Sequence, residues 1–91
     1  MKFPFKEKQL NSYLFLREFS ADVDEIDLIW HTDREDRIVH VVEGNKWKFQ
    51  FDEQLPFEML DGIDIIIPKG IIHRIIKGNG SLKIKVFKEP S

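Results

Sequence analysis

The sequence predicts an all-β domain, an antiparallel barrel or sandwich of about eight short strands. β-branched and aromatic residues dominate the second two-thirds of the chain, and alanine occurs only at Ala21, which disfavours helices. Short stretches of alternating apolar and polar residues are separated by glycine, proline and asparagine, the residues typical of turns. The length of 91 residues suits a single domain covering residues 1–91.

The first third of the chain is expected to contribute two strands. Residues 5–12 are compatible with a helical turn, whereas residues 13–19 favour a strand. Between Asp24 and Trp30 the apolar residues alternate, which predicts a second strand with Ile26 and Leu28 on one face and Asp27 on the other. The charged residues 34–36 that follow are expected to form a turn or a bulge.

The rest of the chain reads as a series of strands joined by tight turns. Strands are expected over residues 37–42 and 47–51, joined by a hairpin at Gly44. Four more are expected over residues 57–60, 63–67, 71–76 and 82–87. Because most of these segments alternate, we expect antiparallel pairing with one face of each strand in a core.

Composition excludes several classes of partner. Charged residues make up 33% of the chain, but they nearly cancel to a net charge of −2 and form no basic block, so neither nucleic acid nor an anionic membrane is expected as a partner. The absence of cysteine excludes disulfides and thiolate ligands. The N-terminal residues lack the apolar stretch of a signal peptide, and the expectation is a soluble cytoplasmic domain.

One segment resembles a known motif. From Gly62 the chain reads GIDIIIPKGIIHRIIK, in which Gly62, Pro68, Gly70 and His73 have the spacing of the second conserved motif of the cupins, small jelly-roll β-barrels. The asparagine that commonly ends this motif is Lys77 here. The resemblance implies an antiparallel jelly-roll barrel in which His73 points inward.

The first cupin motif is present as a frame with altered ligands. In HTDREDRIVHVVEG, His31 takes the position of the first histidine and Gly44 that of the closing glycine, whereas Asp33 replaces the second histidine and Arg37 replaces the glutamate. The resemblance extends over residues 30–87. In the family these positions and the histidine of the second motif hold one divalent metal, and the subunits commonly pair, so a homodimer is expected.

The first interpretation of this constellation is a working metal site. His31 and Asp33 are two residues apart and therefore share one face of an extended segment, which His73 can approach from another strand. Two histidines and one carboxylate form the set typical of non-haem iron(II), and Fe, Ni, Mn or Zn are the candidate metals. The implied function is a metal-dependent oxygenase or isomerase. Arg37 opposes this interpretation because a permanent cation repels a divalent ion.

The second interpretation, which the sequence favours, is an altered site in which Asp33 and Arg37 form an ion pair in place of the metal. An interior that also contains Lys48 and Gln50 would then bind a small polar or anionic molecule, with catalysis left open. In the third interpretation the charges of residues 33–37 form only a solvated turn, which leaves His31 and His73 unexplained. Contact between Arg37 and Asp33 would favour the second interpretation.

Two further features are assigned structural roles. His40 alternates with Arg37 and so lies on the opposite face of its strand, where a packed or interface histidine is expected and a metal ligand is not. Trp47, Phe49 and Phe51 form an aromatic row, for which a core face or a subunit interface is expected and a ligand-stacking platform is the alternative.

Overall fold

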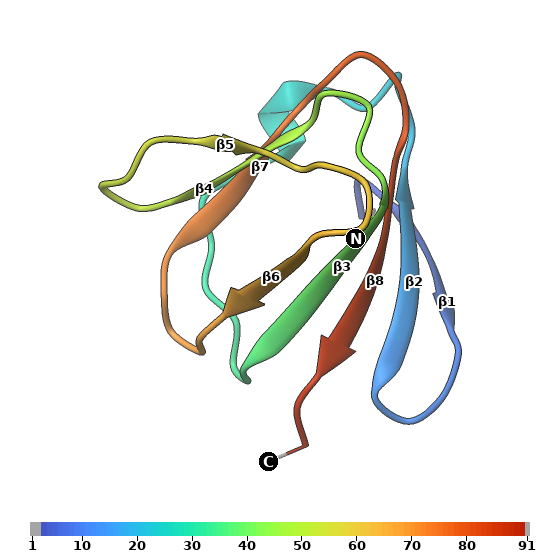
Figure 1. Cartoon of the computed structure of the whole chain (residues 1–91), viewed down its shortest axis with the longest axis vertical. Coiled ribbons are helices and arrows are strands. Elements are labelled where there is room, and N and C mark those ends of the chain that lie inside the picture. Colours follow the sequence, from blue (N-terminus) through green and yellow to red (C-terminus); the bar gives the residue numbers. More distant parts are fainter. Residues whose placement is uncertain (1–2, 91) are drawn as a thin grey trace.

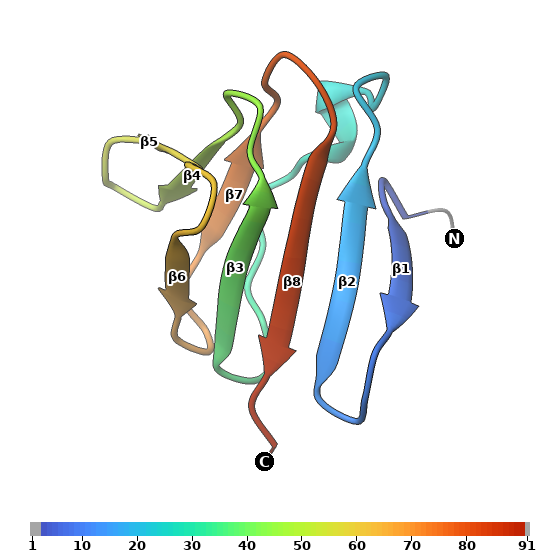
Figure 2. The same cartoon turned by 45° about the vertical axis from the view of Figure 1, so that its right-hand side comes forward.

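Two antiparallel β-sheets face each other in the computed structural model, which describes residues 3–90 (Figures 1 and 2). The larger sheet has the strand order β1-β2-β8-β3-β6 and the smaller sheet the order β5-β4-β7. The strands of the larger sheet are β1 (Lys6–Gln9), β2 (Leu14–Phe19), β3 (Arg37–Glu43), β6 (Asp64–Ile67) and β8 (Leu82–Lys88). Those of the smaller sheet are β4 (Lys48–Phe51), β5 (Phe57–Glu58) and β7 (His73–Ile76). The predicted all-β antiparallel class is confirmed, although the sheets do not close into a continuous barrel.

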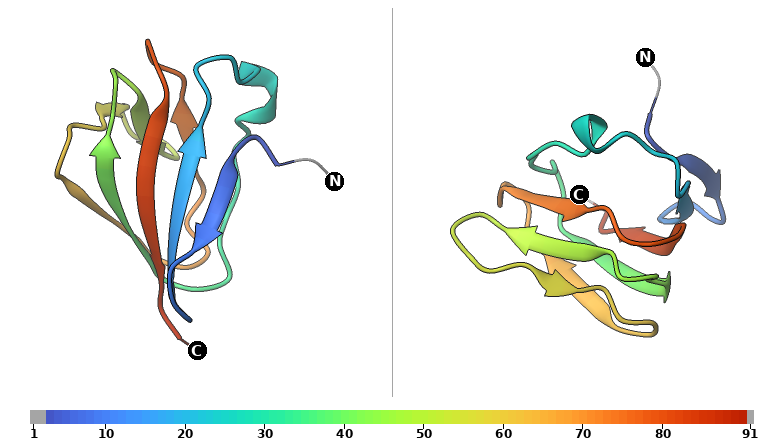
Figure 3. Two further views of the ribbon diagram at one scale, coloured as in Figure 1. Left: turned by 90° about the vertical axis from the view of Figure 1, so that its right-hand side faces the viewer. Right: turned by 90° about the horizontal axis from the view of Figure 1, so that it is seen from above.

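The core lies between the two sheets, which stand face to face in Figure 3. Alternation places the inner residues of each strand opposite those of its neighbour: Val39 pairs with Val86, and Val41 with Ile84. From the smaller sheet, Phe49 faces the same core, and the neighbouring Trp47 is fully buried with its Nε1 donating to the carbonyl of Gly80 at 2.8 Å. Trp47 and Phe49 are therefore core residues, as predicted, whereas Phe51, the third member of the aromatic row, is only partly buried against that core.

The segment before His31 differs from the prediction. Instead of a strand over residues 24–30, a single turn of 3-10 helix, η1 (Glu25–Asp27), follows Asp24, whose side chain accepts a hydrogen bond from the backbone N–H of Ile26 at 3.1 Å. This local bond offers the backbone an alternative to strand pairing. Ile26 and Ile29 are exposed by 77% and 64%, so the alternation here does not reflect a buried face.

The N-terminal segment is also more extended than expected, because Lys6 to Gln9 form strand β1 rather than a helical turn.

The predicted turns are in place: Gly62 and Gly70 have φ values of +86° and +77°, a region that glycine enters without strain. His40 is not packed but exposed, with its Nδ1 2.7 Å from Asp64 Oδ1 on the outer face of the larger sheet. Within residues 3–90, no helix is long and apolar enough to cross a membrane.

Candidate metal centre

The backbone brings His31 and His73 side by side. His31 lies in the extended segment between η1 and β3, and His73 is the first residue of β7. Each donates its backbone N–H to the carbonyl of the other at 3.0 Å, forming an isolated antiparallel bridge. The backbone N–H of Gly70 donates to the carbonyl of Asp33, also at 3.0 Å. Because residues paired in this way project to the same side, the two imidazole rings lie with their centroids only 4.4 Å apart.

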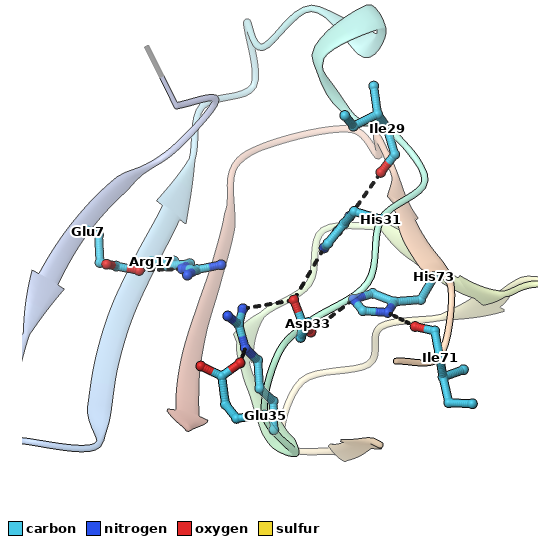
Figure 4. Close-up of polar contacts among 9 residues, drawn as sticks. Glu7, Arg17, Ile29, His31, Asp33, Glu35, Ile71 and His73 are labelled. Carbon is cyan, nitrogen blue, oxygen red and sulfur yellow. Dashed lines mark hydrogen bonds and ion pairs between the residues drawn. The ribbon is translucent and has the colours of Figure 1, made fainter. Parts of the chain in front are cut away.

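Asp33 completes a cluster with these histidines (Figure 4). Its Oδ2 lies 3.3 Å from Nε2 of His73, and its Oδ1 lies 3.8 Å from Nε2 of His31. One potential ligand atom from each residue falls within 4.8 Å of the other two. The side chains of Asp33 and His73 are each 4% exposed, whereas that of His31 is 48% exposed, so solvent reaches the cluster from the His31 side.

Backbone carbonyls set the orientation of both imidazoles. Nδ1 of His31 lies 3.0 Å from the carbonyl oxygen of Ile29, and Nδ1 of His73 lies 2.8 Å from that of Ile71. A carbonyl oxygen only accepts hydrogen bonds, so Nδ1 carries the proton in both rings. When a ring is neutral, its Nε2 then has a lone pair that a metal can use. This tautomer, with Nδ1–H on a carbonyl and Nε2 free, is typical of metal-ligating histidines.

The carboxylate of Asp33 supplies a direct test of whether the cluster fits a cation. Among the described residues, Asp33 Oδ2 is a buried side-chain oxygen with no hydrogen-bond partner. His73 Nε2 lies 3.3 Å away, and it can donate to Oδ2 only if the ring carries a second proton. An unsatisfied buried acceptor typically costs about 1–3 kcal/mol. A divalent cation held by the Asp33 carboxylate and the two imidazoles would satisfy these groups, so the residues present fit a metal.

Arg37 reaches Asp33, as the interpretation without a metal requires. Its Nη1 lies 3.2 Å from Asp33 Oδ1, while its Nε donates to Oε2 of Glu35 at 3.2 Å. The Arg37 guanidinium thus contacts Oδ1 of Asp33 and also forms an ion pair with Glu35, while it leaves Oδ2 of Asp33 without a contact to it. Burial raises the pKa of the Asp33 carboxyl, but hydrogen bonding from the His73 side chain and the charge of Arg37 outweigh it and hold this pKa below the ordinary value.

Lys48 and Gln50 do not line the interior, which corrects the prediction. They alternate on β4 with the buried Phe49, and the pleat therefore turns them to the outer face. There Gln50 Oε1 accepts a hydrogen bond from Nε of Arg74 at 2.9 Å, and the Arg74 guanidinium lies 4.4 Å from the ring centroid of Trp30.

Two cations on the inner face of the larger sheet were missed. Arg17 occupies an inner position of β2 between Phe15 and Phe19, and Lys88 ends β8 directly opposite Arg37. Burial lowers the pKa of the Lys88 ammonium, and the charges of Arg37 and Arg17 lower it further. The sequence did contain a signal for Arg17, since this charged residue stands between Phe15 and Phe19 at a position where the alternation predicts an apolar side chain.

Comparison with known proteins rests on structure alone, since neither a family model nor a curated protein matches the sequence. An RmlC-like cupin family protein with a double-stranded β-helix fold from Methanocaldococcus jannaschii matches 98% of this chain and 83% of its own, with a TM-score of 0.71 and 14% identity. A cupin-2 domain containing protein from Shewanella frigidimarina matches 100% of this chain and 83% of its own, with a TM-score of 0.63 and 20% identity.

A third similar structure is that of FeII HppE, with a TM-score of 0.67 and 14% identity over 84% of this chain. The present chain spans 41% of that protein. Identities in this range establish architecture and not activity. The two facing sheets, their strand order and these superpositions together show that the chain has the cupin fold.

Proposed function

We propose that this protein binds one divalent metal ion through His31, Asp33 and His73 and holds a small polar or anionic molecule beside it. The observation that carries the proposal is the buried Asp33 Oδ2, which has no hydrogen-bond partner among residues 3–90. It lies 3.3 Å from Nε2 of His73, while Nε2 of His31 lies 3.8 Å from Oδ1 of the same carboxylate. Two imidazoles and one carboxylate suit Fe(II), Mn, Ni or Zn. FeII HppE supports the view that a cupin-type fold accommodates such an ion.

The surrounding residues have distinct roles in this proposal. A three-residue ligand set would leave coordination positions open, and a metal held there would supply Lewis-acid chemistry. The carbonyls of Ile29 and Ile71 hold the two imidazoles in the ligating tautomer. Arg37 orients Asp33 through Oδ1. The half-exposed His31 leaves the site accessible to a small molecule, and the inner-face cations favour an anionic one.

The alternative function is binding of a small anion without a metal, and the 3.2 Å contact between Arg37 and Asp33 favours it. Here Arg37 balances the charge of Asp33 through Oδ1, and a protonated His73 donates its Nε2–H to Oδ2. Catalysis by a metal-dependent oxygenase or isomerase would be a further step of the first proposal, since it needs a bound metal.

Elemental analysis of the purified protein tests the proposal. Wild type, Asp33→Asn and His73→Ala are loaded anaerobically with Fe(II), Mn, Ni or Zn, desalted and analysed, and circular dichroism checks that each variant is folded. His40→Ala is the matched control, because His40 lies exposed on the outer face beside Asp64. We expect one metal per chain in wild type and in the control, and loss in the other two variants.

Two results would count against a metal at this site. Retention of equal metal in Asp33→Asn and His73→Ala would place the ion elsewhere. The absence of retained metal under every loading condition would favour the alternative, in which the ion pair of Arg37 and Asp33 balances the site.

A further inference from the structure

A cavity of about 370 Å³ opens beside His31, between the N-terminal segment, β2 and the chain around η1. Sites for small molecules commonly have volumes of about 300–1,000 Å³. The lining is mostly apolar and includes Phe3, Phe5, Phe19, Leu28, Ile29 and Ile75. His31 lines this cavity and also belongs to the metal cluster, so the two sites share a wall.

Among residues 3–90, Arg17 supplies the only full positive charge that lines this cavity. Its side chain is 16% exposed, its guanidinium lies 4.2 Å from the ring centroid of Phe5, and its Nε donates to Glu7. Within residues 3–90, neither Nη1 nor Nη2 of Arg17 donates to a protein acceptor. Figure 4 shows this guanidinium extending from β2 toward the part of the molecule that holds His31 and Asp33.

We infer that this cavity binds a small monoanion with an apolar body, such as a short aliphatic or aromatic carboxylate, through the Nη atoms of Arg17. The inference deepens the proposed function, because it names the ligand class taken beside the metal site. A guanidinium presents parallel N–H groups that match a carboxylate. The apolar body would lie against Phe19, Leu28 and Ile75, where its transfer from water is favourable.

The charges around the cavity limit the ligand to a single negative charge. Glu7 already balances part of the charge of Arg17, and the exposed Asp27 also lines the cavity. A multiply charged anion would meet both carboxylates with one guanidinium to neutralise it. A neutral ligand of the same shape would leave the Nη groups of Arg17 without an acceptor when it displaces water from them.

Titration calorimetry with hexanoate, and with hexanamide as its neutral counterpart, tests the inference on both metal-free and zinc-loaded protein. We expect wild type to bind hexanoate at least about tenfold more tightly than hexanamide, as a charge-assisted hydrogen bond implies. Arg17→Gln should abolish this preference. The double variant Glu7→Gln/Arg17→Gln should do the same without leaving Glu7 unpaired. Arg74→Gln, which removes an arginine from the outer face, should keep the preference.

The outcomes separate this inference from the metal proposal. Equal binding of hexanoate and hexanamide, or binding of neither, overturns the inference whatever the metal content. Binding of hexanoate that needs zinc and is unchanged in Arg17→Gln also overturns it, since the anion then binds to the metal. A preference that depends on Arg17 in a protein that retains no metal supports the anion site while the metal proposal fails.

Discussion

Replacing Arg37 with methionine tests how the buried charge of Asp33 is balanced. Arg37 Nη1 lies 3.2 Å from Asp33 Oδ1, and the two side chains are 15% and 4% exposed. Removing one partner of a buried ion pair typically costs about 3–5 kcal/mol. Because Arg37 retains some exposure and His73 stays beside the carboxylate, we expect Arg37→Met to lower the free energy of unfolding of the metal-free protein by about 2–3 kcal/mol.

A bound divalent metal supplies the positive charge that Arg37 otherwise provides. In the metal-saturated protein we therefore expect the same substitution to cost less than about 1 kcal/mol. By thermodynamic linkage the metal must then stabilise the variant about 2 kcal/mol more than wild type, which corresponds to about 30-fold tighter binding. This result would mean that the positive charges of Arg37 and the metal compete to balance the carboxylate of Asp33, although the Arg37 contact is with Oδ1 alone.

Thermal and urea unfolding with and without saturating zinc measure these differences. For a domain of this size 1 kcal/mol shifts the Tm by about 4–8 °C, so the metal-free variant should melt about 10–20 °C below wild type. Arg34→Met is the matched control, since Arg34 is exposed and should affect neither condition. An equal loss with and without zinc would refute the competition. If zinc stabilises neither protein, the ion pair has replaced the metal.

Three further predictions concern stability and assembly. A Cβ on Gly44 would lie 1.7 Å from the carbonyl oxygen of Met59, so Gly44→Ala should lower the free energy of unfolding in urea by more than about 3 kcal/mol. Gly62 has a φ of +86° but open space around it, so Gly62→Ala should cost only about 1–2 kcal/mol, and equal losses would contradict the steric argument. Trp47→Phe should cost about 2–4 kcal/mol, because the fully buried indole loses volume and a hydrogen bond; a loss of a few tenths would show that the core refills the space. The homodimer implied by the cupin resemblance stays a prediction, for which light scattering should give the mass of two chains. Ile38→Lys, on the exposed outer face of the larger sheet, should weaken the dimer, and a monomeric wild type would contradict the prediction.

Most of the strands could be predicted because their alternation reports a real difference between two faces. In β3, Val39 and Val41 are buried while Ile38 and His40 are exposed, as the period of two requires. Residues 24–30 alternate equally well but have no neighbouring strand, and a side-chain bond from Asp24 closes a 3-10 turn instead. Periodicity predicts faces only where a pairing partner exists, and a single sequence does not show that partner.

The candidate site could be predicted in outline from spacing. The motif positions of His31, Asp33 and His73 placed these residues together, and the structure brings them within ligand distance of one another. The prediction that Lys48 lines the interior was wrong, because Lys48 alternates with the buried Phe49 and therefore lies on the outer face. Arg17 was missed because its relation to His31 depends on how β2 packs across the interior, which neighbouring residues in the sequence do not reveal.

The choice between a metal and an ion pair depends on Oδ2 of Asp33 more than on Arg37. Arg37 contacts Oδ1 and leaves Oδ2 to another partner, so its contact alone does not decide whether a metal is also held. Without a metal, Oδ2 must accept a hydrogen bond from a protonated Nε2 of His73. The Nδ1 of this ring already donates to the carbonyl of Ile71, so the ring would have to be an imidazolium cation although only 4% of its side chain is exposed. Its Nε2 lies 3.3 Å from Oδ2, and Oδ2 nevertheless has no hydrogen-bond partner among residues 3–90. A divalent cation uses the same lone pairs without a buried imidazolium, and the metal proposal therefore explains the site with fewer unsatisfied groups.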